Sequence, residues 1–271
     1  MKKWAALAGG LSLLLCSTTF AAVQENWVEG IVTVTSEASV QTVKNAQEVQ
    51  DGTRIWDEYQ AEKKVREAAE NDARAQLTQY VRAIQVTTTQ TVADLMNTDP
   101  ATAEHVNTLI ARANIVKAQQ TGDKYEMTMT LPIYGITDSV GRAVLPHIYQ
   151  QAFLPQGPKD LVVSEATGVI VDCRGLGLKP VMAVTIKDTA GREIYFYQAM
   201  LWDKVVRYGM AAWGTDPAVL EKAGNMPIRI RAISLTDQQM TPVISIEDAN
   251  RILAANDKTG FLRQCAVVLE K

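Results

Sequence analysis

The sequence has 271 residues, of which 47% are hydrophobic and 21% are charged, and its formal net charge at pH 7 is −3. A chain of this size can bury a core and is long enough for two modest domains without disulfide or metal staples. The Lys and Arg residues form no block, so the chain lacks the electrostatic footprint of a nucleic-acid binder. We therefore expect no nucleic-acid partner.

The N-terminus has the pattern of a secretory signal peptide. Lys2 and Lys3 form a charged start, residues 4–15 are an apolar run too short to span a bilayer comfortably, and small residues follow near Ala21. We predict that residues 1–21 are a signal peptide, cleaved near Ala21 or Ala22. Cleavage lowers the basic residues from 27 to 25 against 30 acidic ones, a net charge of −5. No later stretch has the roughly 18 consecutive apolar residues of a membrane helix. The predicted location is therefore periplasmic or associated with the outer membrane.

Cys16 offers an alternative start for the mature chain. The run Leu13-Leu14-Leu15-Cys16 has the form of a lipobox, which would leave a lipidated Cys16 and attach the protein to a membrane through that lipid. The residue before a lipidated cysteine is usually small, and Leu15 is not. Cleavage near Ala21 is therefore the preferred prediction.

The first half of the mature chain predicts an N-terminal α+β domain over residues 24–152. Its strongest element is a long helix over residues 57–83, because apolar positions recur every three or four residues from Val65 to Ile84. Alanines on this stripe would let the helix lie close to a sheet. The other expected elements are strands at residues 26–35, 85–92, 114–119 and 125–131 and helices at residues 99–112 and 139–152.

A domain boundary is expected at residues 153–158, where two prolines and a glycine in six residues stop both helix and sheet. A C-terminal α+β domain then covers residues 159–271. Its expected elements are strands at residues 168–173, 180–186, 193–197, 228–235, 242–246 and 261–269 and a helix capped by Ser245. The irregular stretch 201–227 is an excursion of a kind that often carries function. The predicted fold class is α+β, with two domains, each a mainly antiparallel sheet packed by helices.

Two cysteines remain in the mature chain, Cys173 and Cys265, and both lie in strand-like runs. If those strands are neighbours, an oxidising compartment could join the cysteines in a disulfide worth roughly 4 kcal/mol. The alternative is that both are small buried core residues.

The sequence contains few groups suited to catalysis. His105 and His147 have no partner at metal-ligand spacing, and hydrolase, phosphate-loop and dinucleotide motifs are missing. Asp172 and Arg174 flank Cys173 and could bind an anion or a carboxylate. An intramolecular salt bridge or turn brace is the favoured interpretation, because no second catalytic group lies beside them in the sequence. We therefore expect no enzymatic activity, no metal site and no cofactor.

Four phrases of the sequence suggest a family. They are ARAQLTQYVRAIQVTTTQTV (73–92), LPIYG (131–135), TGVIVDCRGLGLKP (167–180) and the stretch from SIEDAN to LEK (245–271). Together they resemble the twenty-kilodalton outer-membrane lipoprotein family and the related N-terminal part of flagellar assembly protein T. This resemblance implies an α+β envelope protein without enzymatic activity, usually an accessory or assembly component and sometimes lipidated. Leu15 departs from the lipoprotein pattern.

Two functions follow as expectations. The first is a noncatalytic structural or assembly module of the cell envelope, in flagellar or outer-membrane assembly, which uses exposed sheet edges and the excursion 201–227 to contact envelope or organelle proteins and could form oligomers. The alternative is a periplasmic small-molecule or peptide-binding protein. Its site would lie between the two domains, near Asp172 and Arg174, with Tyr197 and Trp202 pointing into a deep pocket.

Overall fold

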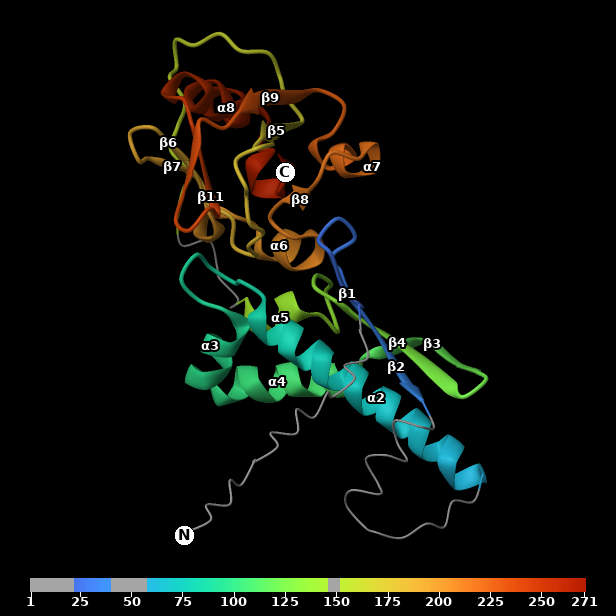
Figure 1. Ribbon diagram of the computed structural model, residues 1–271. Coiled ribbons are helices and arrows are strands. Elements are labelled where there is room, and N and C mark those ends of the chain that lie inside the picture. Colours follow the sequence, from blue (N-terminus) through green and yellow to red (C-terminus); the bar gives the residue numbers. More distant parts are fainter. Residues whose placement is uncertain (1–21, 40–57, 146–151) are drawn as a thin grey trace, which may run out of the picture.

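The structure is a computed structural model that describes residues 22–39, 58–145 and 152–271. The described chain forms an α+β fold in two parts (Figure 1), one from the elements up to α5 and the other from the elements β5 to β12. We call these the first part and the second part. The predicted signal peptide, Cys16 and His147 lie outside the described residues. Their predictions are therefore not addressed by the structure.

The first part is one antiparallel sheet covered by helices. Its elements are β1 (Ala22–Asn26), β2 (Ile31–Ser39), α2 (Glu58–Ala83), α3 (Val92–Thr98), α4 (Pro100–Ala111), β3 (Asn114–Thr121), β4 (Lys124–Pro132) and α5 (Val140–Val144). The strands lie in the order β1-β2-β4-β3, and α2 packs on β2 and β4. The expected long helix and the expected strands at residues 114–119 and 125–131 are therefore present, and these two strands form a hairpin.

Small residues bring α2 close to the sheet. Ala69 and Ala73 are completely buried, and the hydroxyl of Ser36 on β2 donates a hydrogen bond to the carbonyl of Ala69 at 2.5 Å. On another side of α2, Arg74 donates to the carbonyls of Ile110 and Ala111 at 2.8 Å each. Arg74 thus caps the C-terminal end of α4, where carbonyls lack helical partners.

Two expected elements of the first part differ in the structure. The expected strand 85–92 is wrong: residues 85–91 form a turn closed by an isolated bridge between Gln85 and Thr91, and Val92 begins α3. The expected helix 139–152 ends at Val144, because Leu145 is extended. Pro146 follows Leu145 in the sequence, and the residue before a proline disfavours helical backbone.

The second part contains two four-stranded sheets. Its strands are β5 (Gly168–Asp172), β6 (Ile186–Asp188), β7 (Glu193–Tyr195), β8 (Ala212–Trp213), β9 (Pro227–Arg231), β10 (Ser234–Thr236), β11 (Thr241–Ile244) and β12 (Val267–Glu270). Its helices are η1 (Tyr197–Ala199), α6 (Trp202–Tyr208), α7 (Pro217–Leu220), η2 (Glu221–Ala223), α8 (Ile246–Thr259) and η3 (Leu262–Gln264).

These two sheets correct the expectation of a mainly antiparallel second part. The sheet β8-β12-β5-β9 is entirely parallel, and the sheet β10-β11-β6-β7 is mixed, with a parallel pair at its centre. Parallel neighbours need long crossover connections, which the helices and loops between these strands supply. The last strand, β12, is central in its sheet, because it lies between β8 and β5.

The expected boundary at residues 153–158 is packed against the second part. Gly157 donates its backbone N–H to Asp257 at 2.9 Å, and a Cβ at Gly157 would lie 2.3 Å from the backbone nitrogen of Ala254 on α8. Only glycine lets this segment approach the helix backbone so closely. The boundary segment is therefore anchored to α8.

Backbone and aromatic contacts join the two parts. The N–H groups of Met182 and Ala183 donate to the carbonyls of Gln85 and Val86 at 3.0 and 2.8 Å. One cluster of buried apolar residues runs through both parts, and the ring of Trp27 lies 6.0 Å from that of Trp213 in an edge-to-face arrangement. The turn at residues 85–91 is therefore shaped by its partner in the second part.

Candidate functional site

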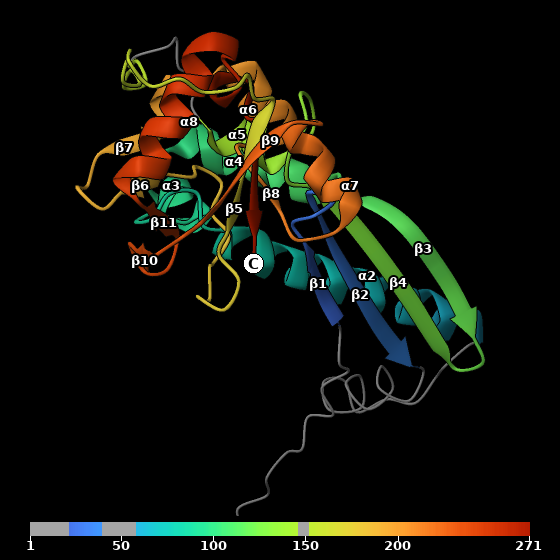
Figure 2. The ribbon, with the colours of Figure 1, turned by 90° about the horizontal axis from the view of Figure 1, so that it is seen from above.

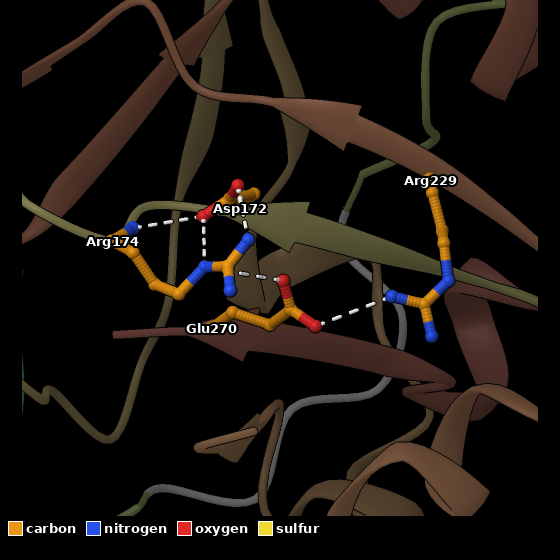
Figure 3. Close-up of polar contacts among 4 residues, drawn as sticks. All are labelled: Asp172, Arg174, Arg229 and Glu270. Atoms are coloured by element: carbon orange, nitrogen blue, oxygen red, sulfur yellow. Dashed lines mark hydrogen bonds and ion pairs between the residues drawn. The ribbon is translucent and has the colours of Figure 1, made fainter.

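Charged side chains gather at the carboxyl ends of three parallel strands. Asp172 of β5 pairs in register with Glu270 of β12 on one side and with Arg231 of β9 on the other. Because the strands are parallel, their carboxyl ends meet at the same edge of the sheet. Arg174, two residues beyond β5, turns back over this edge (Figure 3).

Within this cluster the charges satisfy one another. Arg174 donates from Nε and Nη2 to the two carboxylate oxygens of Asp172, at 2.9 Å each, and its backbone N–H donates to Oδ1 at 3.0 Å. Glu270, which is only 6% exposed, lies 3.9 Å from Arg174 and 3.3 Å from Arg229. The hydrogen bonds from Arg174 lower the pKa of Asp172 to about 2. Asp172 is therefore a permanently ionised brace at neutral pH and a poor general acid or base.

Tyr197 and Trp202 have other partners. Tyr197 lies in η1 and is almost fully buried. Trp202 begins α6, donates from its indole N–H to the carbonyl of Leu145 at 3.4 Å, and stacks under the guanidinium of Arg142 at 4.8 Å from the ring centroid. Trp202 therefore contacts the first part and lines a hollow of about 470 Å³ there. The structure brings Asp172 and Arg174 together and gives the two aromatic residues a separate environment.

The disulfide alternative for Cys173 and Cys265 is wrong: both cysteines are free and buried. Their strands are neighbours, but Val169 pairs with Val267 and Asp172 with Glu270. Cys173 therefore follows the end of β5 while Cys265 precedes the start of β12. At about 3.3 Å per residue the two cysteines lie at opposite ends of the strand pair, well beyond the ~7 Å that a disulfide tolerates between Cα atoms.

A cleft of about 760 Å³ lies between the two parts. The turn between β1 and β2 supplies Trp27, the segment after β4 supplies Tyr134, and the end of α6 supplies Tyr208. Lys222 of η2 and Cys265, which follows η3, complete its central lining. Two of these residues, Tyr208 and Lys222, come from the predicted excursion 201–227.

Lys222 is held in the cleft by backbone oxygens. Its ammonium donates to the carbonyls of Tyr208 and Gly209 at 2.7 and 2.9 Å. These two carbonyls are at the end of α6, where helical carbonyls lack partners and a positive charge is favoured. Burial nevertheless lowers the pKa of Lys222 to about 8.

The hydroxyls of two buried tyrosines, Tyr134 of the cleft lining and Tyr195, differ in their hydrogen bonding. The hydroxyl of Tyr195 donates to the carbonyl of Met210 at 2.7 Å, whereas the buried hydroxyl of Tyr134 has no partner among the described residues. Burial raises the pKa of both phenols and of the Cys265 thiol. All three groups are therefore neutral at physiological pH, and Cys265 is not a ready nucleophile.

Within the described ranges, no three His, Cys, Asp or Glu side chains are grouped so that they could hold a metal ion. The same ranges contain no helix with the length and apolar character needed to cross a bilayer.

The second part has a counterpart among known families. Residues 168–269 match the model of the second domain of Treponema pallidum Tp0624. The match begins at the first residue of β5 and ends within β12, so it spans both sheets of the second part and the second part's side of the cleft. It covers less than half of the chain. A search of curated proteins found no match. The resemblance to the lipoprotein family and to flagellar assembly protein T stays a prediction.

The cleft residues were not predicted as a site from the sequence. Trp27, Tyr134 and Lys222 stand far apart in the chain, and none belongs to a known binding or catalytic motif. The available signals were the irregular excursion 201–227 and the phrase LPIYG, which contains Tyr134.

Proposed function

We propose that the protein is a noncatalytic, exported envelope protein that acts as a structural or assembly module, in flagellar or outer-membrane assembly, through contacts with other envelope proteins. The observation that carries this proposal is the strand β3. The signal-peptide pattern and the family resemblance support the location. The self-paired cluster around Asp172 supports a bracing role for the charges that sequence reasoning had singled out.

Strand β3 is an open edge. It pairs with β4 on one side and is the last strand of its sheet (Figure 2). All eight of its residues are exposed. Val116 is 59% exposed and Ile115 is 44% exposed. An exposed edge strand offers unpaired backbone N–H and C=O groups to another chain, and many complexes form by adding a strand to such an edge.

The edge also has features that limit indiscriminate pairing. The register with β4 shifts between Ile115 and Lys117, so Val116 is the extra residue of a β-bulge. Lys117 forms an ion pair with Glu126 across the strand pair at 2.8 Å. Bulges and lysines on edge strands discourage aggregation. The regular stretch 117–121 is therefore the segment on which we expect a selected partner to add a strand.

Site-specific photocrosslinking in intact envelopes tests this proposal. A photoreactive residue at Gln119, on the regular stretch of β3, is compared with one at Arg66, which is exposed on α2. We expect a defined protein adduct from position 119 and none from position 66. Ala118→Lys, which adds a charge to the edge, should reduce the adduct roughly tenfold while leaving the thermal midpoint unchanged. Equal adducts at both positions, or no effect of Ala118→Lys, would contradict the proposal.

The intact mass of the same purified protein tests export. Cleavage near Ala21 or Ala22 and a lipidated Cys16 give different masses. A chain in the envelope fraction that still carries residues 1–21 would contradict the predicted cleavage of the signal peptide. The photocrosslinking result at β3 would be interpreted independently of this outcome.

A further inference from the structure

We propose that the cleft lined by Trp27, Tyr134, Tyr208, Lys222 and Cys265 binds an organic carboxylate with an apolar or aromatic body. This inference concerns the junction of the two parts and does not depend on the role of β3. Four features of the cleft support it.

The first feature is a cation without a counter-charge. Lys222 donates to two neutral carbonyls, and no carboxylate among the described residues lies within ion-pair distance, 4.0 Å, of its ammonium. Lysines that lose their water are normally paired with an anion. A ligand carboxylate would supply the missing negative charge.

The second feature is unused hydrogen-bond donors. A lysine ammonium has three N–H groups, and the described contacts of Lys222 use two. The hydroxyl of Tyr134 is buried and has no described partner. A buried donor without an acceptor destabilises the folded protein. An oxygen-rich group that enters the cleft would accept a hydrogen bond directly from the ammonium of Lys222. The phenol of Tyr134 belongs to the lining of the same cleft.

The third feature is the apolar wall. Trp27, Val28, Tyr208 and Val219 line the cleft together with three alanines, Ala211, Ala212 and Ala218. The volume of about 760 Å³ falls within the range of ligand pockets, about 300–1,000 Å³, and junctions between domains are a common location for them. These surfaces would hold an aliphatic or aromatic body.

The fourth feature is the remaining charge. Arg207 also lines the cleft, and its guanidinium lies 5.7 Å from the centroid of the Tyr208 ring. Glu29 and Glu221 line the cleft as well. These carboxylates would repel a ligand of high negative charge, so we infer a monoanion. Such a carboxylate could be a free organic acid or the C-terminal carboxylate of a peptide.

Matched probes on the mature full-length chain test the inference. They are 3-phenylpropionate with its neutral amide, and N-acetyl-Ala-Phe as the free acid and as the amide. Binding is followed by tryptophan fluorescence and by calorimetry. We expect at least one acid to bind roughly tenfold or more tightly than its amide. Preference for the free acid, or for the peptide acid, identifies the source. Equal binding of acids and amides, or no binding of any probe at millimolar concentration, would overturn the proposal.

Two variants assign the binding to Lys222. Lys222→Met should reduce the affinity for the acid to that for the amide. Lys258→Met is the matched control, because Lys258 also donates to a backbone carbonyl, that of Val163, and does not line the cleft. If Lys222→Met keeps the preference for the acid, the assignment is wrong.

A measurement on the unmodified protein covers the case that Lys222→Met fails to fold. With lysine labelled at ¹³Cε, one resonance should titrate near pH 8 in the free protein, as burial of Lys222 requires. The same resonance should titrate at a higher pH when the acid probe is bound, because a nearby anion stabilises the charged amine. No change on addition of a probe that binds would contradict the proposed contact.

Discussion

The aromatic ring of Tyr134 lies directly against Gly209. A Cβ atom at Gly209 would be 2.7 Å from Cε2 and 2.8 Å from Cζ of Tyr134. Tyr134 belongs to the first part and Gly209 follows α6 in the second, and the neighbouring residue Gly135 donates its N–H to the carbonyl of Val206 at 2.8 Å. This close approach therefore fixes how the two parts meet at the cleft.

Gly209→Ala should lower the free energy of unfolding for two reasons. The backbone at Gly209 has φ 72° and ψ 162°, a region that is essentially restricted to glycine and costs alanine about 1–3 kcal/mol, and the added methyl would meet the Tyr134 ring. Gly122→Ala is the control for a positive φ alone, because Gly122 has a φ of 62° and nothing within 4 Å of an added Cβ. Denaturant unfolding should show Gly209→Ala as the more damaging change by about 1–3 kcal/mol. Equal losses would mean that the ring contact is unimportant.

Tyr134→Phe should leave the free energy of unfolding unchanged or raise it by up to about 1 kcal/mol, because it removes a buried hydroxyl that has no described partner. Tyr195→Phe is the comparison. Its hydroxyl donates to the carbonyl of Met210 at 2.7 Å, so its removal should cost about 1–2 kcal/mol. Thermal and urea denaturation of both variants measure the difference. A destabilised Tyr134→Phe would indicate that this hydroxyl has a partner in solution.

Ala73→Leu should destabilise the first part by about 1–3 kcal/mol, because Ala73 is completely buried where α2 packs on the sheet. Ala75→Leu places the same side chain on the exposed face of the same helix. It should change the stability by less than about 0.5 kcal/mol. Urea unfolding of the two variants isolates the packing effect from helix propensity.

Asp172→Asn should lower the free energy of unfolding at neutral pH. It should also reduce the loss of stability that occurs as the pH falls. The pKa of Asp172 in the folded protein is about 2, below the ~3.9 of an unfolded chain, so its ionised form stabilises the fold above about pH 4. That contribution is lost as the pH falls through about 2. Because the Arg174 side chain is 59% exposed, we expect no more than about 1 kcal/mol.

Denaturant unfolding between pH 7 and pH 2 measures this contribution. Asp123→Asn, in the exposed turn between β3 and β4, is the control. An unchanged pH profile for Asp172→Asn would show that the Arg174 pair is immaterial to folding.

The two cysteines should remain thiols even when the protein is prepared without reductant. Burial raises the pKa of Cys173 to about 12 and also raises that of Cys265. A thiol reagent should therefore react slowly with the native mature protein and count two thiols after denaturation. Reductant should leave the melting temperature unchanged. A count of zero after denaturation would imply a disulfide that this fold does not allow.

Local patterns in the sequence predict local structure well. The stripe from Val65 to Ile84 correctly predicted α2, and Ser245 caps α8 through a hydrogen bond from the backbone N–H of Asp248 at 3.0 Å. The turn at residues 85–91 was mistaken for a strand because its β-branched residues suit a sheet. Its hydrogen bonds to Met182 and Ala183 are contacts between distant segments, which propensity does not encode.

Local sequence patterns could not predict the direction of the strands in the second part or the lining of the cleft. An apolar run such as residues 168–172 reads the same in a parallel and in an antiparallel sheet, and the crossovers decide between them. Asp172 and Arg174 were recognised because they lie only two positions apart in the chain. Lys222 has no such neighbour, and its partners, the carbonyls of Tyr208 and Gly209, are backbone atoms that carry no sequence signature.

The pairing of β12 with β5 sets an order for folding. This pairing joins residues roughly 100 positions apart in the chain. The entropic cost of closing so long a loop must be met before the strand contacts that stabilise it can form. Tyr208 and Lys222 lie inside the loop that this pairing closes. We therefore expect the cleft to assemble late, after β12 has emerged and docked. The first part, whose hairpin β3–β4 is local, can form earlier. The second part would then complete the cleft by docking against the residues that the first part already holds in place.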